Sequence, residues 1–432
     1  MKKIFNSALA LLLFAATTHA QDVNKLISQK DVERVITTLA SDDMKGRGDY
    51  QPGIEMAAKF IETEFKKTGL EPLPGNADYR QRFNIYRSAV TKSAVSLNGT
   101  AVPADHVTAL SGSSFNWSNN SDVQVIKIAA TQNVQTEIRA LRQSDKKAIV
   151  ILDPSFERYF KRLQMSAAAG ISGLKQSPLQ AVLVLGTFDE VKTFEVNVEV
   201  KREELPMANI AGMIKGKTRP DEYVIFSGHY DHLGIVKPVG QDSIANGADD
   251  DASGTTAVLM LANYYKKLNN NARTLIFVAF TAEEVGEYGS QYFATQVDPQ
   301  KVTAMFNIEM IGKASKFGQN SAFITGYERS DFGEILQRNL KGTAFKFYPD
   351  PYTEQNLFYR SDNASLAAVG VPAHTISTDQ IDIDKLYHTV GDEFSSLDVA
   401  NITSTIRAIA LSSRGIVSGA DTPKRVPKLE KK

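Results

Sequence analysis

The chain has 432 residues, of which 42% are hydrophobic and 23% are charged, and its formal net charge is zero. This composition excludes an intrinsically disordered protein, and the lack of a basic excess argues against a nucleic-acid partner. The length indicates two domains, or one large domain with an insertion. Because the chain contains no cysteine, a metal site would have to use imidazole and carboxylate ligands.

The first twenty residues have the three-part pattern of a secretory signal peptide. Lys2 and Lys3 precede the short apolar run "ALALLLFAA", and a small residue comes directly before Gln21. The run is too short to span a bilayer, and no later stretch predicts a membrane span. We therefore expect an exported protein, periplasmic or extracellular, that loses residues 1–20. A buried N-terminal helix is the alternative interpretation.

Residues 21–85 and 201–418 are predicted to form one α/β domain. The first part contains the helical patterns "KDVERVITTLA" and "GIEMAAKFIETEFKKTG", and Gly69 marks the predicted end of the second helix. In the second part the buried-strand runs "YVIFSG", "RTLIFVAF" and "VTAMFNIEM" alternate with the helical patterns "SGTTAVLMLANYYKKL" and "SQYFATQV". This alternation predicts a three-layer sandwich with a mainly parallel central sheet.

Residues 86–200 have a different pattern. Short β-type runs such as "KKAIVILD" and "LQAVLVLG" follow one another with turns between them, and one helical pattern, "FERYFKRLQMSAAAG", interrupts them. We interpret this segment as an inserted, mostly β domain. The basic, proline-containing residues 419–432 are predicted to form a disordered tail.

Chemically active side chains follow the predicted strands, at the edge where sheets of this kind bind ligands. His229 comes directly after the first of these strands, and Asp231 lies two positions later, where it could accept a hydrogen bond from the imidazole. This arrangement is typical of a metal-bound histidine, and it also fits an ordinary surface histidine. His232 is not assigned to a metal.

The stretch "NGADDDASG" places Asp249, Asp250 and Asp251 side by side before a predicted helix. Adjacent carboxylates repel one another, which normally costs stability. A helix N-terminus would stabilise Asp251 as a cap, but capping does not explain all three aspartates. A divalent cation would, because its charge keeps neighbouring carboxylates ionised. A solvated acidic loop is the alternative.

Four further residues, two adjacent glutamates, a third glutamate and a histidine, complete the set of chemically active side chains. Glu283 and Glu284 end a strand, where adjacent side chains diverge, so that one could bind a metal and the other a water beside it. An acidic helix start is the alternative for this pair. Glu309 follows a mostly apolar run, where a charge is costly unless it is paired, and His388 lies in the polar stretch "YHTVGDEF".

Taken in their order along the chain, these motifs resemble those of the co-catalytic zinc aminopeptidases of clan MH. That group includes secreted bacterial leucyl-type aminopeptidases and glutamate carboxypeptidase relatives. The resemblance covers most of residues 30–85 and 205–415 and rests on "GHYDHLG", "GADDDASG", "AEEVGEYGS" and "YHTVGD". The insertion lies where relatives carry a protease-associated β domain. The family most often has aspartate at the position of Glu309. The segment "RSDNASLAAVGVPA" resembles the family's serine–aspartate motif, with Asn363 in place of the commoner histidine.

The resemblance implies a catalytic domain with two zinc ions, or other divalent metals, held by five side chains. The implied ligands are His229 and Glu309 for one ion, Glu284 and His388 for the other, and Asp250 as a bridge between them. Asp231 would orient His229, and Glu283 would be the general base.

The expected function is therefore that of a secreted zinc-dependent exopeptidase, an aminopeptidase that removes N-terminal residues from peptides with a free N-terminus. A metal-activated water would attack the peptide bond, with Glu283 as the general base. Cyclisation of N-terminal glutamine, carboxypeptidase action and dipeptidase action on the same fold are alternatives. A non-catalytic, receptor-like relative is a further alternative, and it would be expected to have lost ligand residues.

Overall fold

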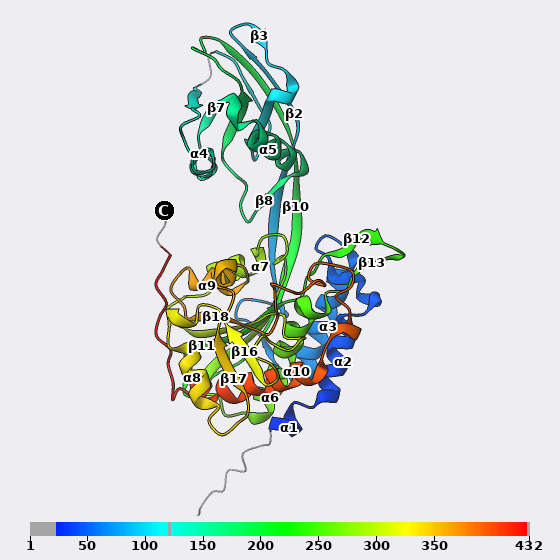
Figure 1. Ribbon diagram of the computed structural model, residues 1–432. Helices are drawn as coiled ribbons and strands as arrows, with labels where there is room; N and C mark the ends of the chain where they lie inside the picture. The colour runs from blue at the N-terminus through cyan, green and yellow to red at the C-terminus, as the bar shows by residue number, and fades with distance from the viewer. Residues whose placement is uncertain (1–22, 120–121, 430–432) are drawn as a thin grey trace, which may run out of the picture.

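The structure is a computed structural model that describes residues 23–119 and 122–429. The predicted signal peptide, residues 1–20, lies outside the described residues, so its removal stays a prediction. The described chain forms a lower and an upper lobe, which two long strands join (Figure 1). The N-terminal and C-terminal helices both belong to the lower lobe (Figure 1).

A large mixed sheet runs through the lower lobe. Its strands, in spatial order, are β17 (Lys346–Pro349), β16 (Ser321–Ile324), β18 (Ala373–Ser377), β15 (Val302–Ile308), β11 (Arg219–His229), β14 (Arg273–Phe280), β10 (Phe194–Ile214), β2 (Arg80–Leu97) and β3 (Thr100–Ala101). The four central strands β18, β15, β11 and β14 are parallel to one another. The antiparallel pairs of this order, such as β10 with β14, lie toward its two ends. The predicted α/β fold with a mainly parallel central sheet is confirmed.

Helices cover both faces of this sheet, which is therefore the middle of three layers (Figure 1). Val224 and Phe226 of β11 pack on one face and Ile225 on the other, as expected for a strand buried on both sides. The first face carries α1 (Val23–Leu26), α2 (Gln29–Leu39), α3 (Pro52–Thr68), α6 (Gly254–Leu268), α8 (Phe332–Asn339), α10 (Val399–Ser412) and α11 (Arg414–Ser418), and the second carries α7 (Tyr288–Gln296) and α9 (Asn363–Ala367). Within the described residues, no helix has the length and hydrophobicity needed to cross a bilayer.

Helix α3 ends where the sequence predicts. Gly69 has a φ of 77°, and its N–H donates to the carbonyls of Phe65 and Lys66. A side chain would strain this left-handed conformation, so glycine favours the end of the helix at this position.

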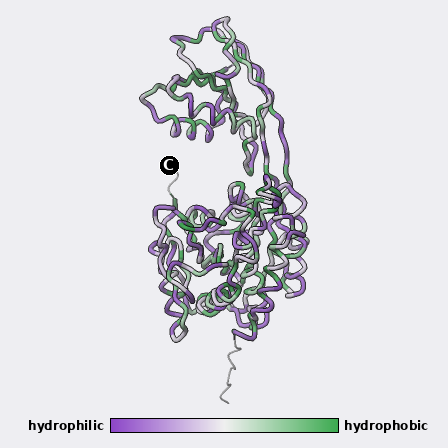
Figure 2. The backbone as a smooth tube through the Cα atoms, turned by 45° about the vertical axis from the view of Figure 1, so that its right-hand side comes forward, coloured by the Kyte–Doolittle hydropathy of each residue, from purple (hydrophilic) through white to green (hydrophobic). Residues whose placement is uncertain are grey.

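Strands β2 and β10 leave the lower lobe as one antiparallel ribbon that carries the upper lobe (Figure 2). Their pairing begins at Arg80 and Ile210, next to the central sheet, and continues to Leu97 and Phe194 in the upper lobe. The inserted segment is therefore continuous with the central sheet and is not attached through flexible loops.

Among its described residues, the upper lobe has a separate four-stranded sheet and two α-helices. Its strands are β4 (Val107–Ser111), β9 (Gln180–Leu185), β7 (Lys147–Leu152) and β6 (Gln124–Ile128), and its helices are α4 (Val134–Arg142) and α5 (Glu157–Ala169). Short strands complete the structure: β1 (Glu71–Pro72), β5 (Phe115–Trp117) and β8 (Ile171–Gly173), with β12 (Gly234–Val239) and β13 (Asp242–Ala245) as a separate hairpin. The sequence predicts helix α5 but not α4. The boundaries of an inserted domain at residues 86–200 stay a prediction.

The C-terminal tail differs from the expected disordered segment. Val426 is buried in the second core, and the Arg425 guanidinium donates a 2.8 Å hydrogen bond to the carbonyl of Val302. Further along, the N–H of Leu429 donates to the carbonyl of Ala368. These contacts attach residues 420–429 to the lower lobe, because one apolar side chain and several backbone groups gain partners there.

His374, in β18, is buried as a neutral imidazole. Its Nδ1 lies 2.9 Å from the carbonyl oxygen of Thr325, and its Nε2 lies 2.7 Å from the hydroxyl of Ser330. Burial lowers the pKa of His374 to about 4. In the unfolded chain its pKa is about 6.5, so between these values the unfolded state binds a proton that the folded state does not. The free energy of unfolding should therefore fall by up to about 3 kcal/mol between pH 6.5 and pH 4 because of this residue.

Chemical denaturation of the wild type and of His374→Gln over this pH range checks the prediction. The variant is expected to start from a lower stability but to lose less of it on acidification. Parallel pH dependences of the two proteins would contradict a neutral, buried His374.

Candidate metal centre

The predicted site residues converge at the carboxyl ends of the central strands. His229 is the last residue of β11, Asp250 lies in the turn before α6, Glu283 and Glu284 follow β14, and Glu309 follows β15. Because β14, β11 and β15 are adjacent and parallel, their carboxyl ends meet at one edge of the sheet.

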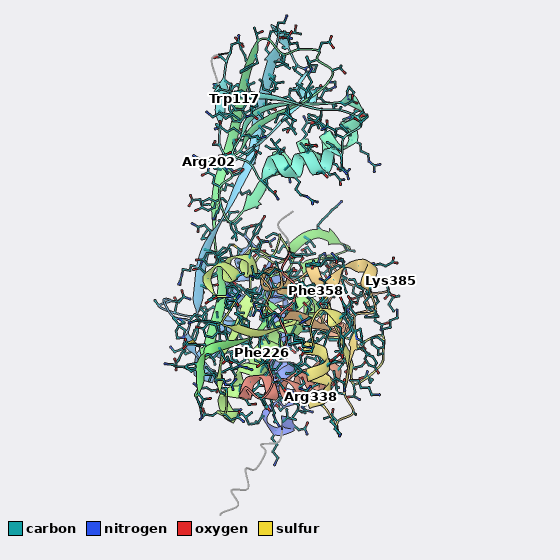
Figure 3. The ribbon with its side chains drawn as sticks, turned by 90° about the vertical axis from the view of Figure 1, so that its left-hand side faces the viewer. Trp117, Arg202, Phe226, Arg338, Phe358 and Lys385 are labelled. Atoms are coloured by element: carbon teal, nitrogen blue, oxygen red, sulfur yellow. The ribbon has the colours of Figure 1, made fainter. Side chains whose placement is uncertain are left out.

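This edge faces the upper lobe. In Figure 3, Phe358 and Lys385, which lie in the two segments beside the site, appear in the half of the lower lobe that is nearer the upper lobe. Phe226, in the middle of β11, lies deeper in the lower lobe, and Arg338 lies farther still from the upper lobe.

The first set of candidate ligands surrounds one oxygen of Asp250. The Nε2 atom of His229 lies 3.1 Å from Asp250 Oδ1 and 3.1 Å from Glu309 Oε1. His229 and Asp250 are buried, and Glu309 is partly buried. One imidazole nitrogen and two carboxylate oxygens thus converge, which is an arrangement that a metal ion stabilises.

The second set surrounds the other oxygen of Asp250. The Nε2 atom of His388 lies 3.3 Å from Asp250 Oδ2 and 3.1 Å from Glu284 Oε2. The two sets therefore share Asp250, with one of its oxygens in each. This geometry brings together all five residues that the sequence analysis names as ligands.

Two residues that the sequence analysis does not assign hold the remaining carboxylate oxygens. The hydroxyl of Ser361 donates to Glu309 Oε2 at 2.5 Å, and Nδ1 of His232 lies 2.7 Å from Glu284 Oε1. Nδ1 of His232 also lies 3.7 Å from Asp250 Oδ2, so its imidazole is a further candidate ligand beside the second set. The pattern "RSDN" contains Ser361 and "HYDHLG" contains His232, but neither pattern shows which oxygen they contact.

The other two aspartates of the acidic triplet have partners of their own. Asp251 accepts hydrogen bonds from the N–H groups of Gly254, Met310 and His229, so it caps the start of α6 and ties it to β15 and β11. Asp249 forms an ion pair with Lys313, with Nζ and Oδ2 3.2 Å apart. The repulsion expected in the triplet is therefore relieved separately at each residue.

The turn that carries Asp250 is fixed by two buried residues. The carboxylate of Asp392 accepts hydrogen bonds from the N–H groups of Asp249 and Asp250 at 3.0–3.1 Å. The guanidinium of Arg47, which is fully buried, donates to the carbonyl of Gly247 at 2.8 Å. Asp392 lies in the stretch "YHTVGD" quoted above, and Arg47 lies in "MKGRGDY", but their role depends on contacts between distant segments.

Asp231 lies behind His229, but its carboxylate is not the nearest acceptor. The Nδ1 atom of His229 is 3.1 Å from the backbone carbonyl oxygen of Asp231 and 3.7 Å from its carboxylate Oδ1. The other carboxylate oxygen accepts a hydrogen bond from the N–H of Glu284 at 3.1 Å. Asp231 is thus placed to orient both His229 and the strand end that carries Glu284.

Glu283 lies beside the first set. Its Oε2 atom is 3.9 Å from His229 Nε2, and its side chain is partly accessible. Burial, together with the nearby negative charges of Glu309 and Asp362, raises the pKa of Glu283 well above its ordinary value. The residue does not occupy a ligand position in either set, so its carboxylate is available to a water molecule.

The charge balance of the centre fits bound cations. Hydrogen bonds to Asp250 and Glu284 raise the pKa of His388 to about 10. Burial opposes ionisation of Asp250, but His232, His229 and His388 outweigh that effect and lower its pKa well below the ordinary value. The surrounding carboxylates thus stabilise positive charge at this position, and imidazole with carboxylate is a donor set that zinc accepts.

A cavity with roughly 560 Å³ of empty space, in part open to solvent, adjoins the centre. Asp250, Glu283 and Glu309 form one side of it, and Phe323 and Leu357 belong to its apolar wall. Because the cavity adjoins the centre and combines apolar and charged lining residues, it is a candidate position for part of a substrate.

Residues 209–412 match the family model described as peptidase family M28. This segment belongs to peptidase family M28. It covers slightly less than half of the chain and contains Glu283 and all five candidate ligands. The resemblance to zinc peptidases that the motifs indicate is thereby confirmed at the level of the family.

Curated relatives of the M28 segment include peptidases. The chain is 30% identical over 223 residues to a leucine aminopeptidase 1 of Ajellomyces capsulatus, a match that covers 49% of this chain and 57% of that protein. It is 34% identical over 110 residues to a probable zinc metalloprotease of Pyrenophora teres f. teres, over 25% of this chain and 23% of that protein. The chain thus spans between about a quarter and little more than half of the length of these relatives.

Solved structures share the fold over nearly the whole chain. A zinc aminopeptidase from Bacillus subtilis has a TM-score of 0.56 and 17% identity, with 94% of this chain and 96% of that chain covered. An aminopeptidase from Aneurinibacillus sp. strain AM-1 has a TM-score of 0.53 and 17% identity, with 95% and 97% covered. At this identity the likeness establishes the three-layer fold.

Proposed function

We propose that the protein is a two-zinc aminopeptidase that hydrolyses the first peptide bond of substrates with a free N-terminus. The observation that carries the proposal is the shared position of Asp250, whose two oxygens face two separate sets of histidine and glutamate ligands. Each set supplies three protein ligands, the number that catalytic zinc sites combine with a water. The names of the M28 relatives support the same activity.

The chain's own residues divide the work of hydrolysis. Zinc, when bound, lowers the pKa of a coordinated water toward about 7 and polarises the scissile carbonyl. Glu283, which lies beside the first set, takes the proton of the attacking water and delivers it to the leaving amine. Ser361 and His232 hold the outer oxygens of Glu309 and Glu284 and so keep both ligands in position.

Hydrolysis assays on matched peptides test this proposal. The zinc-loaded protein is expected to release the first residue of a peptide with a free amine and to leave its N-acetylated copy intact. Cleavage of both peptides from the carboxyl end, or cyclisation of an N-terminal glutamine without hydrolysis, would contradict it and support the corresponding alternative.

The two histidines next to Glu284 give a sharper test of the ligand set. His388→Asn removes a proposed ligand, so the metal content should fall from two ions per chain to one. His232→Asn is the matched control, because it removes a residue that contacts Glu284 Oε1 but is not assigned to the ion. It should retain two ions after dialysis, as measured by mass spectrometry of the metals. Loss of an ion from the His232 variant and not from the His388 variant would reverse the assignment.

We further propose that the protein is exported, on the basis of residues 1–20 alone. The intact mass of the protein recovered from the periplasm or the medium checks this. A chain that starts at Gln21 would support export, and a chain that retains Met1 would contradict it.

A further inference from the structure

Apart from the three centre residues, other side chains form the rest of the wall of the cavity beside the metal centre. The apolar part of this wall includes Met310, Phe323, Leu357 and Ile381. In a bound peptide, the carbonyl to be cleaved belongs to the first residue. The side chain of that residue therefore lies close to the centre, and this wall is the part of the cavity that could receive it.

One buried carboxylate belongs to the same wall. Asp379, two residues after the end of β18, is only 3% exposed and lines the cavity. Neither of its carboxylate oxygens accepts a hydrogen bond from the described residues. A buried carboxylate without a donor is costly when it is ionised, so Asp379 either keeps a proton or pairs with a ligand that supplies a donor.

The surrounding charges do not compensate Asp379. Oxygen atoms of Asp249 and Asp384 lie within 4.8 Å of an oxygen of Asp379. Lys313 pairs with those two residues, at 3.2 Å from Asp249 and 2.6 Å from Asp384. One ammonium group therefore faces three carboxyl groups, which cannot all be ionised without a surplus of negative charge. Arg360 also lines the cavity, but it is exposed to solvent, where its charge is screened.

We propose that Asp379 selects substrates whose first residue has a cationic side chain, lysine or arginine, and this inference rests on the aminopeptidase function proposed above. The methylene stem of such a side chain would lie along the apolar wall, and its charged end would pair with Asp379. The pocket would thus match both parts of the side chain, whereas a purely apolar side chain would leave the carboxylate without a partner.

The ionisation of Asp379 is consistent with this role. Burial and the neighbouring charge of Asp249 raise the pKa of Asp379 to about 8. The carboxyl group of Asp379 therefore holds a proton near neutral pH unless a cation pairs with it, and a cationic side chain would replace that proton as its partner.

Lysyl and norleucyl p-nitroanilides measure the effect of the charge alone, because norleucine has a linear stem without the ammonium group. With the zinc-loaded enzyme, kcat/KM for the lysyl substrate should exceed that for the norleucyl substrate by roughly tenfold or more. Asp379→Asn should lower this ratio by roughly tenfold or more. Asp382→Asn, an exposed aspartate in the same segment, is the matched control and should keep the wild-type ratio.

The wild-type ratio decides the proposal even if the variant fails to fold. A ratio of one or less in the wild type overturns the inference, and so does an unchanged ratio in Asp379→Asn. Cleavage of the norleucyl substrate without a lysyl preference overturns this inference alone. Failure of the zinc-loaded wild type to cleave either substrate overturns the aminopeptidase proposal, and the inference with it.

Discussion

Replacing Glu283 by glutamine should remove nearly all turnover while both metal ions stay bound. The substitution keeps the shape of the side chain but removes the carboxylate that accepts the proton of water. Because a positioned general base typically contributes about 10²–10⁴-fold, kcat should fall by that factor. The side chain is not in either ligand set, so the metal content should stay at two ions per chain.

Glu287→Gln is the matched control for this experiment. The residue lies four positions later, before helix α7, and undergoes the same chemical change without lining the cavity. It should retain most of the wild-type kcat. A Glu283→Gln enzyme with wild-type turnover would rule out the proposed base, and one that has lost its metals would show that Glu283 is a ligand.

Replacing Asp250 by asparagine should prevent binding of both ions. The side chain supplies one oxygen to each ligand set, and an amide has one neutral oxygen and an NH2 group in their place. Zinc should raise the melting temperature of the wild type, since an ion that binds the folded state stabilises it, but not that of the variant. Hydrolytic activity should fall at least as far as in the Glu283 variant.

The neighbouring Asp249→Asn is the control. Asp249 pairs with Lys313 and has no atom in either set, so this variant should still bind two ions and show the zinc-dependent rise in melting temperature. Two ions bound to the Asp250→Asn protein would contradict the shared position of this residue.

The central part of the site could be predicted from the sequence because adjacent parallel strands place their carboxyl ends together. His229, Glu284 and Glu309 each follow a buried-strand run, so their convergence follows from the order of β14, β11 and β15. The acidic triplet marks Asp250 in the same way, since three adjacent carboxylates need an explanation. The confirmed sandwich fold and the M28 match agree with this part of the prediction.

The contacts that hold the ligands could not be predicted, because they depend on side-chain positions. His232 is adjacent to Asp231 in the sequence, yet its ring contacts Glu284 from another strand end. Ser361 contacts Glu309 across 52 residues of sequence. The nearest acceptor of His229 Nδ1 is a backbone carbonyl, although the pattern indicates the carboxylate of Asp231.

The differences in the fold have several causes. Helix α4 has only nine residues, but its buried Val134, Ile138 and Leu141 follow the i, i+4, i+7 spacing of an amphipathic helix and Asn133 caps its start, so the sequence contains a signal that the prediction misses. The ordered tail depends on Val426 finding a place in the second core, which composition does not reveal. Strands β2 and β10 are also longer than ordinary strands, so local patterns divide them at the lobe boundary.

Anomalous diffraction from crystals of the zinc-loaded protein would test the central claim most directly. Two peaks are expected, roughly 3.5–4 Å apart, with the carboxylate of Asp250 between them. The first peak should lie next to His229 and Glu309, and the second next to His388 and Glu284. A single peak, or two peaks that Asp250 does not join, would contradict the two-zinc centre on which the proposed activity depends.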